Sequence, residues 1–176
     1  MTRAFARLAY TPSVRAAQQR NGAREHSERM AQRPPERDEL PEEMQARIAN
    51  ANSIIIGTAS LEGWPHLQHR GGPRGFIKVL GPRSLAFADY AGNRQYITVG
   101  NLAENDRIFL LLIDYAARTR LKIWGRGRVV TDDPDLLEQV RDADYRARVE
   151  RVIRIDVEAW DTNCSSHIPR LVPADD

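Results

Sequence analysis

The sequence has little cysteine, little lysine and no long apolar run. Its one cysteine, Cys164, excludes the internal disulfide framework of a small secreted protein. Its longest apolar stretches, Ser53–Gly57 and Ile108–Ile113, are far shorter than the roughly 20 residues that cross a bilayer. No apolar segment that resembles a secretory signal follows Met1. We therefore expect a cytoplasmic protein that does not enter a membrane.

The sequence also has no large excess of positive or negative charge, because 26 basic residues are balanced by 24 acidic ones. This balance and the absence of an aromatic stacking platform argue against a nucleic-acid partner. The bases are nevertheless unevenly spread, since residues 1–24 contain five arginines and no acid. Such a start is typical of a transit peptide or of an arm whose helix packs on a partner, and we expect the arm. Only Lys78 and Lys122 are lysines, against 24 arginines.

Motifs for metal binding or nucleophilic catalysis are weak. His66 and His69 are three residues apart, a spacing that points their side chains to opposite faces of a strand. Cys164 and His167 form a Cys-x-x-His pair, but the second pair that a structural zinc site needs is missing. A phosphate loop, a dinucleotide fingerprint and a nucleophile elbow are absent as well. We expect no metal site, and the catalytic residues stay unknown.

The length of 176 residues predicts about one domain. Residues 1–40 form a polar arm with a helix from Pro12 to about Arg33, residues 41–160 form the domain, and residues 161–176 form an irregular tail. Further helices are expected after Pro41, at residues 101–104 and over residues 133–149. Hairpin-length turns between the strands predict a mostly β, antiparallel six-stranded barrel with flanking helices. The predicted strands are Ser53–Ala59, Pro65–Leu80 with a break at Gly71–Pro73, Leu85–Asp89, Ile108–Tyr115, Arg120–Val130 and Val152–Val157.

Groups that favour an anion gather in the middle of the chain. Lys78 stands among apolar residues of a strand, where its charge needs either solvent or an anion. The loop after Asp89 carries Gly92, which allows close backbone approach, and then Asn93 and Arg94, which offer several donors. These residues could converge on one phosphate. Alternatively, Lys78 extends to solvent and Arg94 is a solvated turn residue, and the residues alone leave both interpretations open.

The order and spacing of five segments carry a family resemblance over about residues 45–160. Together they resemble the pyridoxamine 5′-phosphate oxidase-like family of FMN-binding split barrels. In the leader, Phe5, Thr11–Val14 and Gln18 are similar to a bacterial branch of that superfamily. The five segments are Phe76–Lys78, Leu85–Asp89, Gly92–Arg94, Glu104–Arg107 and Arg120–Arg128.

The resemblance implies a six-stranded antiparallel split barrel and a homodimer with FMN at the subunit interface. It implies an FMN-dependent oxidoreductase that acts on a small substrate or electron donor. The alternative is a non-catalytic protein that stores or senses flavin or haem on the same barrel, because a fold does not fix a function.

The resemblance also assigns cofactor-binding positions. Lys78 matches a lysine that reaches the FMN phosphate or the substrate side of the flavin. Arg120 falls where the family often has a glutamine near the flavin ring, contributed by the second subunit. Ala88 and Asp89 match the end of the strand that passes the ribityl chain and ring of FMN. Asn93, Arg94 and Gln95 fall where the family has a Ser-Arg-Lys triplet that binds the phosphate. The implied set is Lys78, Ala88, Asp89, Asn93, Arg94, Gln95 and Arg120.

Three departures from the family pattern matter. Gln95 replaces the lysine of the triplet, which weakens the charge around the phosphate. Gly71–Pro73 interrupts the strand where the family has an arginine, and Arg70 could take its place. The C-terminal Arg-x-His substrate clamp of the true oxidase is missing, although His167 and Arg170 lie in that region. We therefore do not expect a true pyridoxamine 5′-phosphate oxidase.

Overall fold

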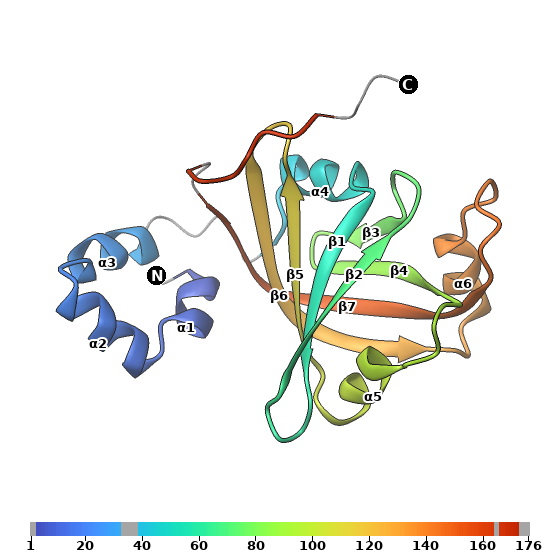
Figure 1. Cartoon of the computed structure of the whole chain (residues 1–176), viewed down its shortest axis with the longest axis horizontal. Coiled ribbons are helices and arrows are strands. Elements are labelled where there is room, and N and C mark those ends of the chain that lie inside the picture. Colours follow the sequence, from blue (N-terminus) through green and yellow to red (C-terminus); the bar gives the residue numbers. More distant parts are fainter. Residues whose placement is uncertain (1–2, 33–38, 164–165, 173–176) are drawn as a thin grey trace.

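One antiparallel sheet of seven strands, in the order β2-β1-β5-β6-β7-β4-β3, curls around the core of the protein (Figure 1). The computed structural model describes residues 3–32, 39–163 and 166–172. All neighbouring strands are antiparallel, as the hairpin-length turns predict. The strands are β1 (Ser53–Ala59), β2 (Pro65–Gly71), β3 (Ile77–Gly81), β4 (Ser84–Tyr90), β5 (Arg107–Asp114), β6 (Thr119–Val130) and β7 (Val149–Asn163).

Alternating apolar residues of the central strands build the core. Ile108, Leu110 and Leu112 of β5 are buried, and Leu121 and Ile123 of β6 meet them across the ladder. Because successive side chains of a strand point to opposite faces, the residues between them lie on the outer face of the sheet. The outer face of β5 and β6 is thereby set by the same alternation that fills the core.

Three helices cover the ends and one side of the sheet. Helix α4 (Glu42–Ala49) buries Met44 and Ile48 in the core. Helix α5 (Ile97–Glu104) follows β4 and contacts β1, β2 and β6. Helix α6 (Pro134–Val140) lies on the outer side of β4 and β7, and Asp133 caps it by accepting a hydrogen bond from the backbone of Leu136 at 2.9 Å. Within the described ranges, no helix has the length and apolar character of a membrane span.

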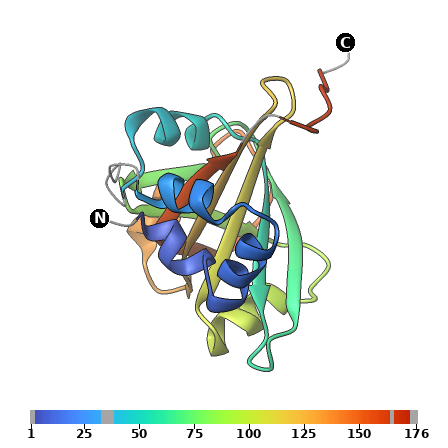
Figure 2. The ribbon, with the colours of Figure 1, turned by 90° about the vertical axis from the view of Figure 1, so that its left-hand side faces the viewer.

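The N-terminal arm consists of α1 (Ala4–Ala9), α2 (Pro12–Arg20) and α3 (Arg24–Gln32), which lie beside the sheet (Figure 2). Phe5 packs near Trp124 with ring centroids 6.5 Å apart, and Arg3 pairs with Asp161 of β7 at 3.4 Å. The arm therefore packs on its own chain, whereas the sequence suggested a helix packed on a partner. The arm is three short helices because Asn21 and Gly22, which has φ +66°, end α2.

The predicted strand Pro65–Leu80 is two strands, so the sheet has seven strands instead of six. β2 and β3 stand at opposite edges of the sheet. The turn between them is tight, because a Cβ atom at Gly72 would lie only 2.7 Å from Cβ of Phe76. Pro73 has no backbone N–H donor, so the hydrogen bonds between β1 and β2 cannot continue through it.

Two predicted helices are also corrected. The helix expected over residues 133–149 ends at Val140, and Asp142 accepts a hydrogen bond from the backbone of Asp144, which stabilises a turn. β7 accordingly begins earlier and ends later than predicted. Asn101, expected as a helix cap, is inside α5, where its buried amide donates to Thr58 Oγ1 at 3.0 Å. The polar partner on β1 explains why an asparagine is tolerated there.

Candidate functional site

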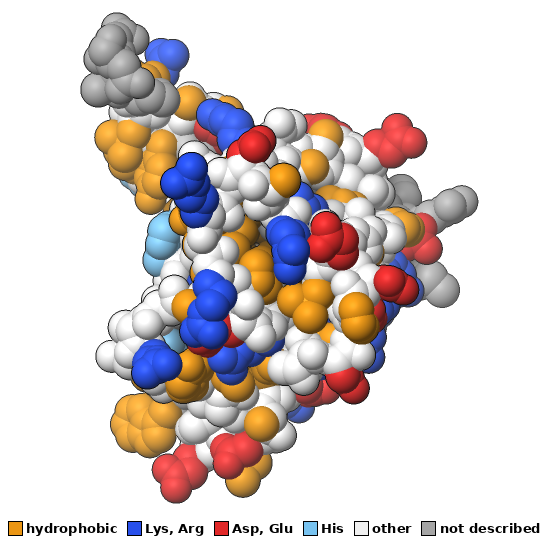
Figure 3. Space-filling model, turned by 90° about the vertical axis from the view of Figure 1, so that its right-hand side faces the viewer, with side chains coloured by type: hydrophobic (Ala, Val, Ile, Leu, Met, Phe, Trp, Pro, Cys, Tyr) orange, Lys and Arg blue, Asp and Glu red, His pale blue; other side chains and the backbone are white. Residues whose placement is uncertain are grey.

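A pocket lies where β4 ends and the chain enters α5 through the loop 91–96. β2 and β7 complete its walls, on the side of the molecule where α6 and this loop lie and where Lys and Arg side chains are prominent (Figure 3). β2, at one end of the strand order, and β4, next to the other end, thus meet at this pocket. The wall residues used below are Arg70, Asp89, Asn93, Arg94, Gln95, Tyr96 and Glu150.

The loop 91–96, whose residues 92–96 line the pocket, has an unusual backbone. Arg94 and Tyr96 have φ angles of 61° and 53°, in the left-handed region that residues other than glycine seldom occupy. Left-handed residues of this kind occur in the backbone concavities that bind anions. Among the described residues no side chain caps the N-terminus of α5, and the first turn of this helix lines the pocket. Its backbone N–H groups therefore favour a negative charge.

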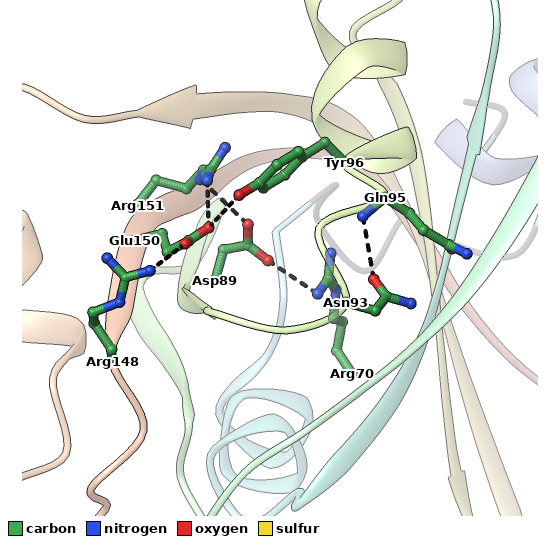
Figure 4. A network of polar contacts seen from close by, with 8 residues as sticks. All are labelled: Arg70, Asp89, Asn93, Gln95, Tyr96, Arg148, Glu150 and Arg151. Carbon is green, nitrogen blue, oxygen red and sulfur yellow. Dashed lines mark hydrogen bonds and ion pairs between the residues drawn. The ribbon is translucent and has the colours of Figure 1, made fainter.

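A buried carboxylate forms the floor of the charged network (Figure 4). Asp89 is 4% exposed, and its oxygens lie 3.0 Å from Nη1 of Arg70 and 3.5 Å from Nε of Arg151. Burial raises the pKa of Asp89, while the two arginines oppose that rise. Nε of Arg70 is buried and has no hydrogen-bond partner within the described part of the chain. The wall of the pocket therefore contains a buried guanidinium donor that no described residue satisfies.

Glu150 ties the loop to β7 (Figure 4). Its carboxylate lies 2.6 Å from Nη2 of Arg151 and 2.7 Å from Nη2 of Arg148, and it accepts a hydrogen bond from the Tyr96 hydroxyl at 3.3 Å. The guanidinium carbon of Arg151 is 4.8 Å from the centroid of the Tyr96 ring. Sequence reasoning missed Glu150 and Arg151, because nothing local shows that the start of β7 lies beside this loop.

The arrangement suits an anionic group better than acid–base chemistry. Around the pocket four arginines, at positions 70, 94, 148 and 151, outnumber the two carboxylates of Asp89 and Glu150. Planar guanidinium groups and backbone N–H groups together match the oxygens of a phosphate ester. The described lining residues include no histidine, cysteine or lysine, so the lining offers no evident nucleophile with its base.

Four of the seven residues implied by the family resemblance line this pocket, namely Asp89, Asn93, Arg94 and Gln95. Lys78 of β3 pairs with Ala86 of β4. Directly paired residues share a face, and on that face Ala86 and Ala88 are buried against α6. Successive residues of β4 alternate, so Lys78 and Ala88 lie on the opposite face of the sheet from Asp89.

Arg120 lies far from the pocket of its own chain. It pairs with Asn163 of β7, whereas Asp89 pairs with Arg151, twelve residues earlier on the same strand. At roughly 3.3 Å per residue the path along β7 between these two positions is about 40 Å. One chain therefore does not bring Arg120 and Asp89 to the same site.

The C-terminal tail packs at the turn between β5 and β6. The carbonyl of Ile168 accepts a hydrogen bond from Nε of Arg118 at 2.9 Å, and the backbone N–H of Leu171 donates to Tyr115 at 3.4 Å. His167 and Arg170 are exposed on this tail. Cys164 lies outside the described residues.

Comparisons with known proteins agree with this architecture. The family model described as Pyridoxamine 5′-phosphate oxidase matches residues 40–164. HupZ of Group A Streptococcus is 20% identical with a TM-score of 0.54, and the match covers 69% of this chain and 91% of HupZ. A candidate pyridoxamine 5′-phosphate oxidase from Lactobacillus delbrueckii is 22% identical with a TM-score of 0.53, covering 72% and 96%.

An F420 reductase is 15% identical with a TM-score of 0.50, covering 69% of this chain and 98% of the reductase. At these identities the structural similarity establishes the fold alone. A search of the curated proteins found no match.

Proposed function

The chain belongs to the pyridoxamine 5′-phosphate oxidase family, and on this premise we propose that it is a flavoprotein that binds the FMN phosphate in the pocket between β4 and α5. We further propose that it is an FMN-dependent oxidoreductase for a small substrate or electron donor. The observation that carries the proposal is the convergence of Arg70, Arg94 and the first turn of α5 on one pocket. A phosphate monoester is the part of FMN that these donors recognise.

Arginine supplies the charge at this site. The planar fork of Arg94 can bind two phosphate oxygens at once. Gln95 is neutral where the family resemblance implies a lysine, and its backbone N–H donates to Oδ1 of Asn93 at 3.3 Å. Asn93 therefore stabilises the turn of the loop, while Arg70 and Arg94 line the pocket in which we propose that the phosphate binds.

The residues present fit the phosphate end of FMN, because the wall holds an unpaired buried donor, Nε of Arg70, beside uncapped backbone N–H groups. When bound, FMN supplies hydride and single-electron transfer. In this proposal the arginines and backbone N–H groups of the pocket hold the phosphate and thereby fix one end of the cofactor. We assign no acid or base to a described lining residue.

We propose a homodimer with FMN at the subunit interface, because the outer face of the sheet carries unused apolar surface. Phe109 and Leu111 of β5 point to this face and are only half-buried, next to Ile55 of β1. Trp64 and Leu67, on the adjoining hairpin, are 74% and 70% exposed. Arg120 is on the same face, so a second copy would supply an Arg120 that the pocket's own chain keeps distant.

The absorbance spectrum of the purified protein tests the cofactor. We expect flavin bands, and release of FMN on denaturation. A Soret band would instead indicate haem, and a colourless protein that does not take up added FMN would contradict the proposal. Reduction of the bound flavin by NADH or NADPH tests the oxidoreductase part, and a flavin that no donor reduces would favour storage or sensing.

A further inference from the structure

We propose that Asp89 is a positioning residue of the anion site, whose carboxylate holds Arg70 in the pocket wall and, through Arg151, the Tyr96 end of the loop 91–96. The inference rests on the proposed function and names the residue that sets the affinity of this pocket for a phosphate ester. Asp89 acts through its neighbours and does not contact the phosphate itself, because two like charges would repel each other.

The ion pair with Arg70 joins strands that are not neighbours. In the sheet order four strands separate β2, which carries Arg70, from β4, which carries Asp89. The 3.0 Å contact between Nη1 of Arg70 and Oδ1 of Asp89 therefore closes the barrel at the pocket (Figure 4). Arg70 is only 26% exposed, so its guanidinium has few other positions once this pair is made. The pair orients the remaining donors of Arg70 beside the anion site.

The second ion pair of Asp89 reaches the loop. Nε of Arg151 lies 3.5 Å from Oδ2 of Asp89, and the guanidinium of Arg151 packs against the Tyr96 ring. Glu150 holds Arg151 and the Tyr96 hydroxyl from the other side. Tyr96 is one of the two left-handed residues that shape the loop. Through Arg151, Asp89 thus supports the backbone that presents Arg94.

A charged Asp89 is costly for the fold. Burial raises its pKa even though two arginines lie close by. A pKa that is higher in the folded than in the unfolded chain means that protonation favours folding, and this contribution is lost as the pH rises through the raised pKa. Ionisation of Asp89 in this buried position therefore costs folding free energy, which the two neighbouring arginines offset only in part. Charges of this kind are concentrated at functional sites.

The substitution Asp89→Asn separates positioning from simple electrostatics, because it removes the charge with little change of shape. Loss of a negative charge next to an anion site should by itself tighten FMN binding. Loss of positioning should weaken it, and we expect roughly tenfold weaker binding, which is about 1.4 kcal/mol. We expect a melting temperature that is unchanged or higher. Fluorescence titration of the apoprotein with FMN and thermal unfolding measure the two effects.

A double-mutant cycle tests whether Asp89 acts through Arg70. In an Arg70→Gln background, Asp89→Asn should no longer weaken FMN binding by the full tenfold. Asp106→Asn is the matched control, since Asp106 pairs with Arg126 at 2.7 Å outside the pocket, and it should leave FMN affinity unchanged. Equal or tighter binding by Asp89→Asn, or effects of the two substitutions that simply add, would overturn the proposal.

Two further measurements keep the test decisive. If Asp89→Asn does not fold, Arg151→Gln removes the link to the loop, together with the ion pair between Arg151 and Glu150, and leaves the pair between Arg70 and Asp89 in place. Unchanged FMN affinity of this variant would then refute the link through Arg151. If the wild-type protein takes up no FMN, the proposed function fails, and titration of the same variants with inorganic phosphate tests Asp89 separately. Equal phosphate affinity of wild type and Asp89→Asn would overturn the role of Asp89.

Discussion

At the scale of single residues, position in the fold separates the cations that the sequence groups together. Lys78 and Arg94 both look like phosphate ligands in the sequence. In the structure Arg94 lines the pocket, whereas Lys78 is on the face of the sheet that α6 covers. The alternation of side chains along β4 and β3 decides this difference, because a shift of one residue changes the face.

We therefore expect Arg94→Ala to weaken FMN binding more than Lys78→Ala. A charge-assisted hydrogen bond contributes about 1.5–3 kcal/mol, so the loss for Arg94→Ala should be roughly ten- to a hundredfold. Fluorescence titration of each apoprotein with FMN measures it, and Lys78→Ala serves as the matched control. An Arg94 variant with wild-type affinity would disprove the phosphate assignment.

At the scale of elements, the short connections determine where the strands go. The turn from β2 to β3 sends consecutive strands to opposite edges of the sheet, and it places Arg70 at the pocket just before the break. The C-terminal tail packs at the opposite turn, between β5 and β6. The connections thus decide which side chains share the site.

The β2–β3 turn should tolerate no side chain at Gly72. The Cβ atom of Gly72→Ala would lie 2.7 Å from Cβ of Phe76, which is buried in the core. Such overpacking costs roughly 1–3 kcal/mol of unfolding free energy. Chemical denaturation measures this change, and Gly81→Ala, where no atom lies within 4 Å of the added Cβ, is the control. Equal stability of the two variants would contradict the tight turn.

The position of the C-terminal tail indicates a substrate that we do not expect this protein to oxidise. Pyridoxamine phosphate carries its own phosphate dianion, which needs a second clamp beside the flavin. His167 and Arg170 are separated by Pro169, which fixes the local backbone, and they sit on the β5–β6 turn. We expect little or no oxygen-dependent formation of pyridoxal phosphate when FMN is fully bound. Turnover of about 0.1 per second or more would show that this expectation is wrong.

At the scale of the whole molecule, the sheet has an apolar outer face that the arm covers in part. α1 packs on this face near Trp124, and the ring centroids of Phe5 and Trp124 lie 6.5 Å apart. Phe109, Leu111 and Ile55 remain half-buried beyond it. This surface is the place where we propose that a second copy docks.

The proposed dimer gives a measurable mass. Sedimentation at micromolar concentration should yield about twice the 20.0 kDa of one chain. Leu111→Glu puts a charge on the outer face of β5 and should shift the protein toward monomer and weaken FMN binding together. Leu171→Glu is the matched control, because Leu171 is 55% exposed on the tail. A wild-type monomer that holds FMN would contradict the shared site.

Much of this protein is determined by local sequence. The alternation in β5 and β6 predicts their inner and outer faces, and turn residues predict the hairpins, because both depend on neighbouring residues only. The segment Gly92–Gln95 after a strand predicts a loop for the same reason, and this loop lines the pocket where we propose that an anion binds. The family resemblance adds the split barrel, which local physics alone does not supply, and it is the source of our proposal that the cofactor is FMN.

The tertiary structure alone decides the walls of the site. Arg70, Asp89 and Arg151 come from three strands, and their approach depends on the order of the strands and the closure of the barrel. Glu150 belongs to the pocket only because β7 begins earlier than its apolar alternation suggests. Strand order and closure are set by packing of the whole core, so no local pattern of residues encodes them.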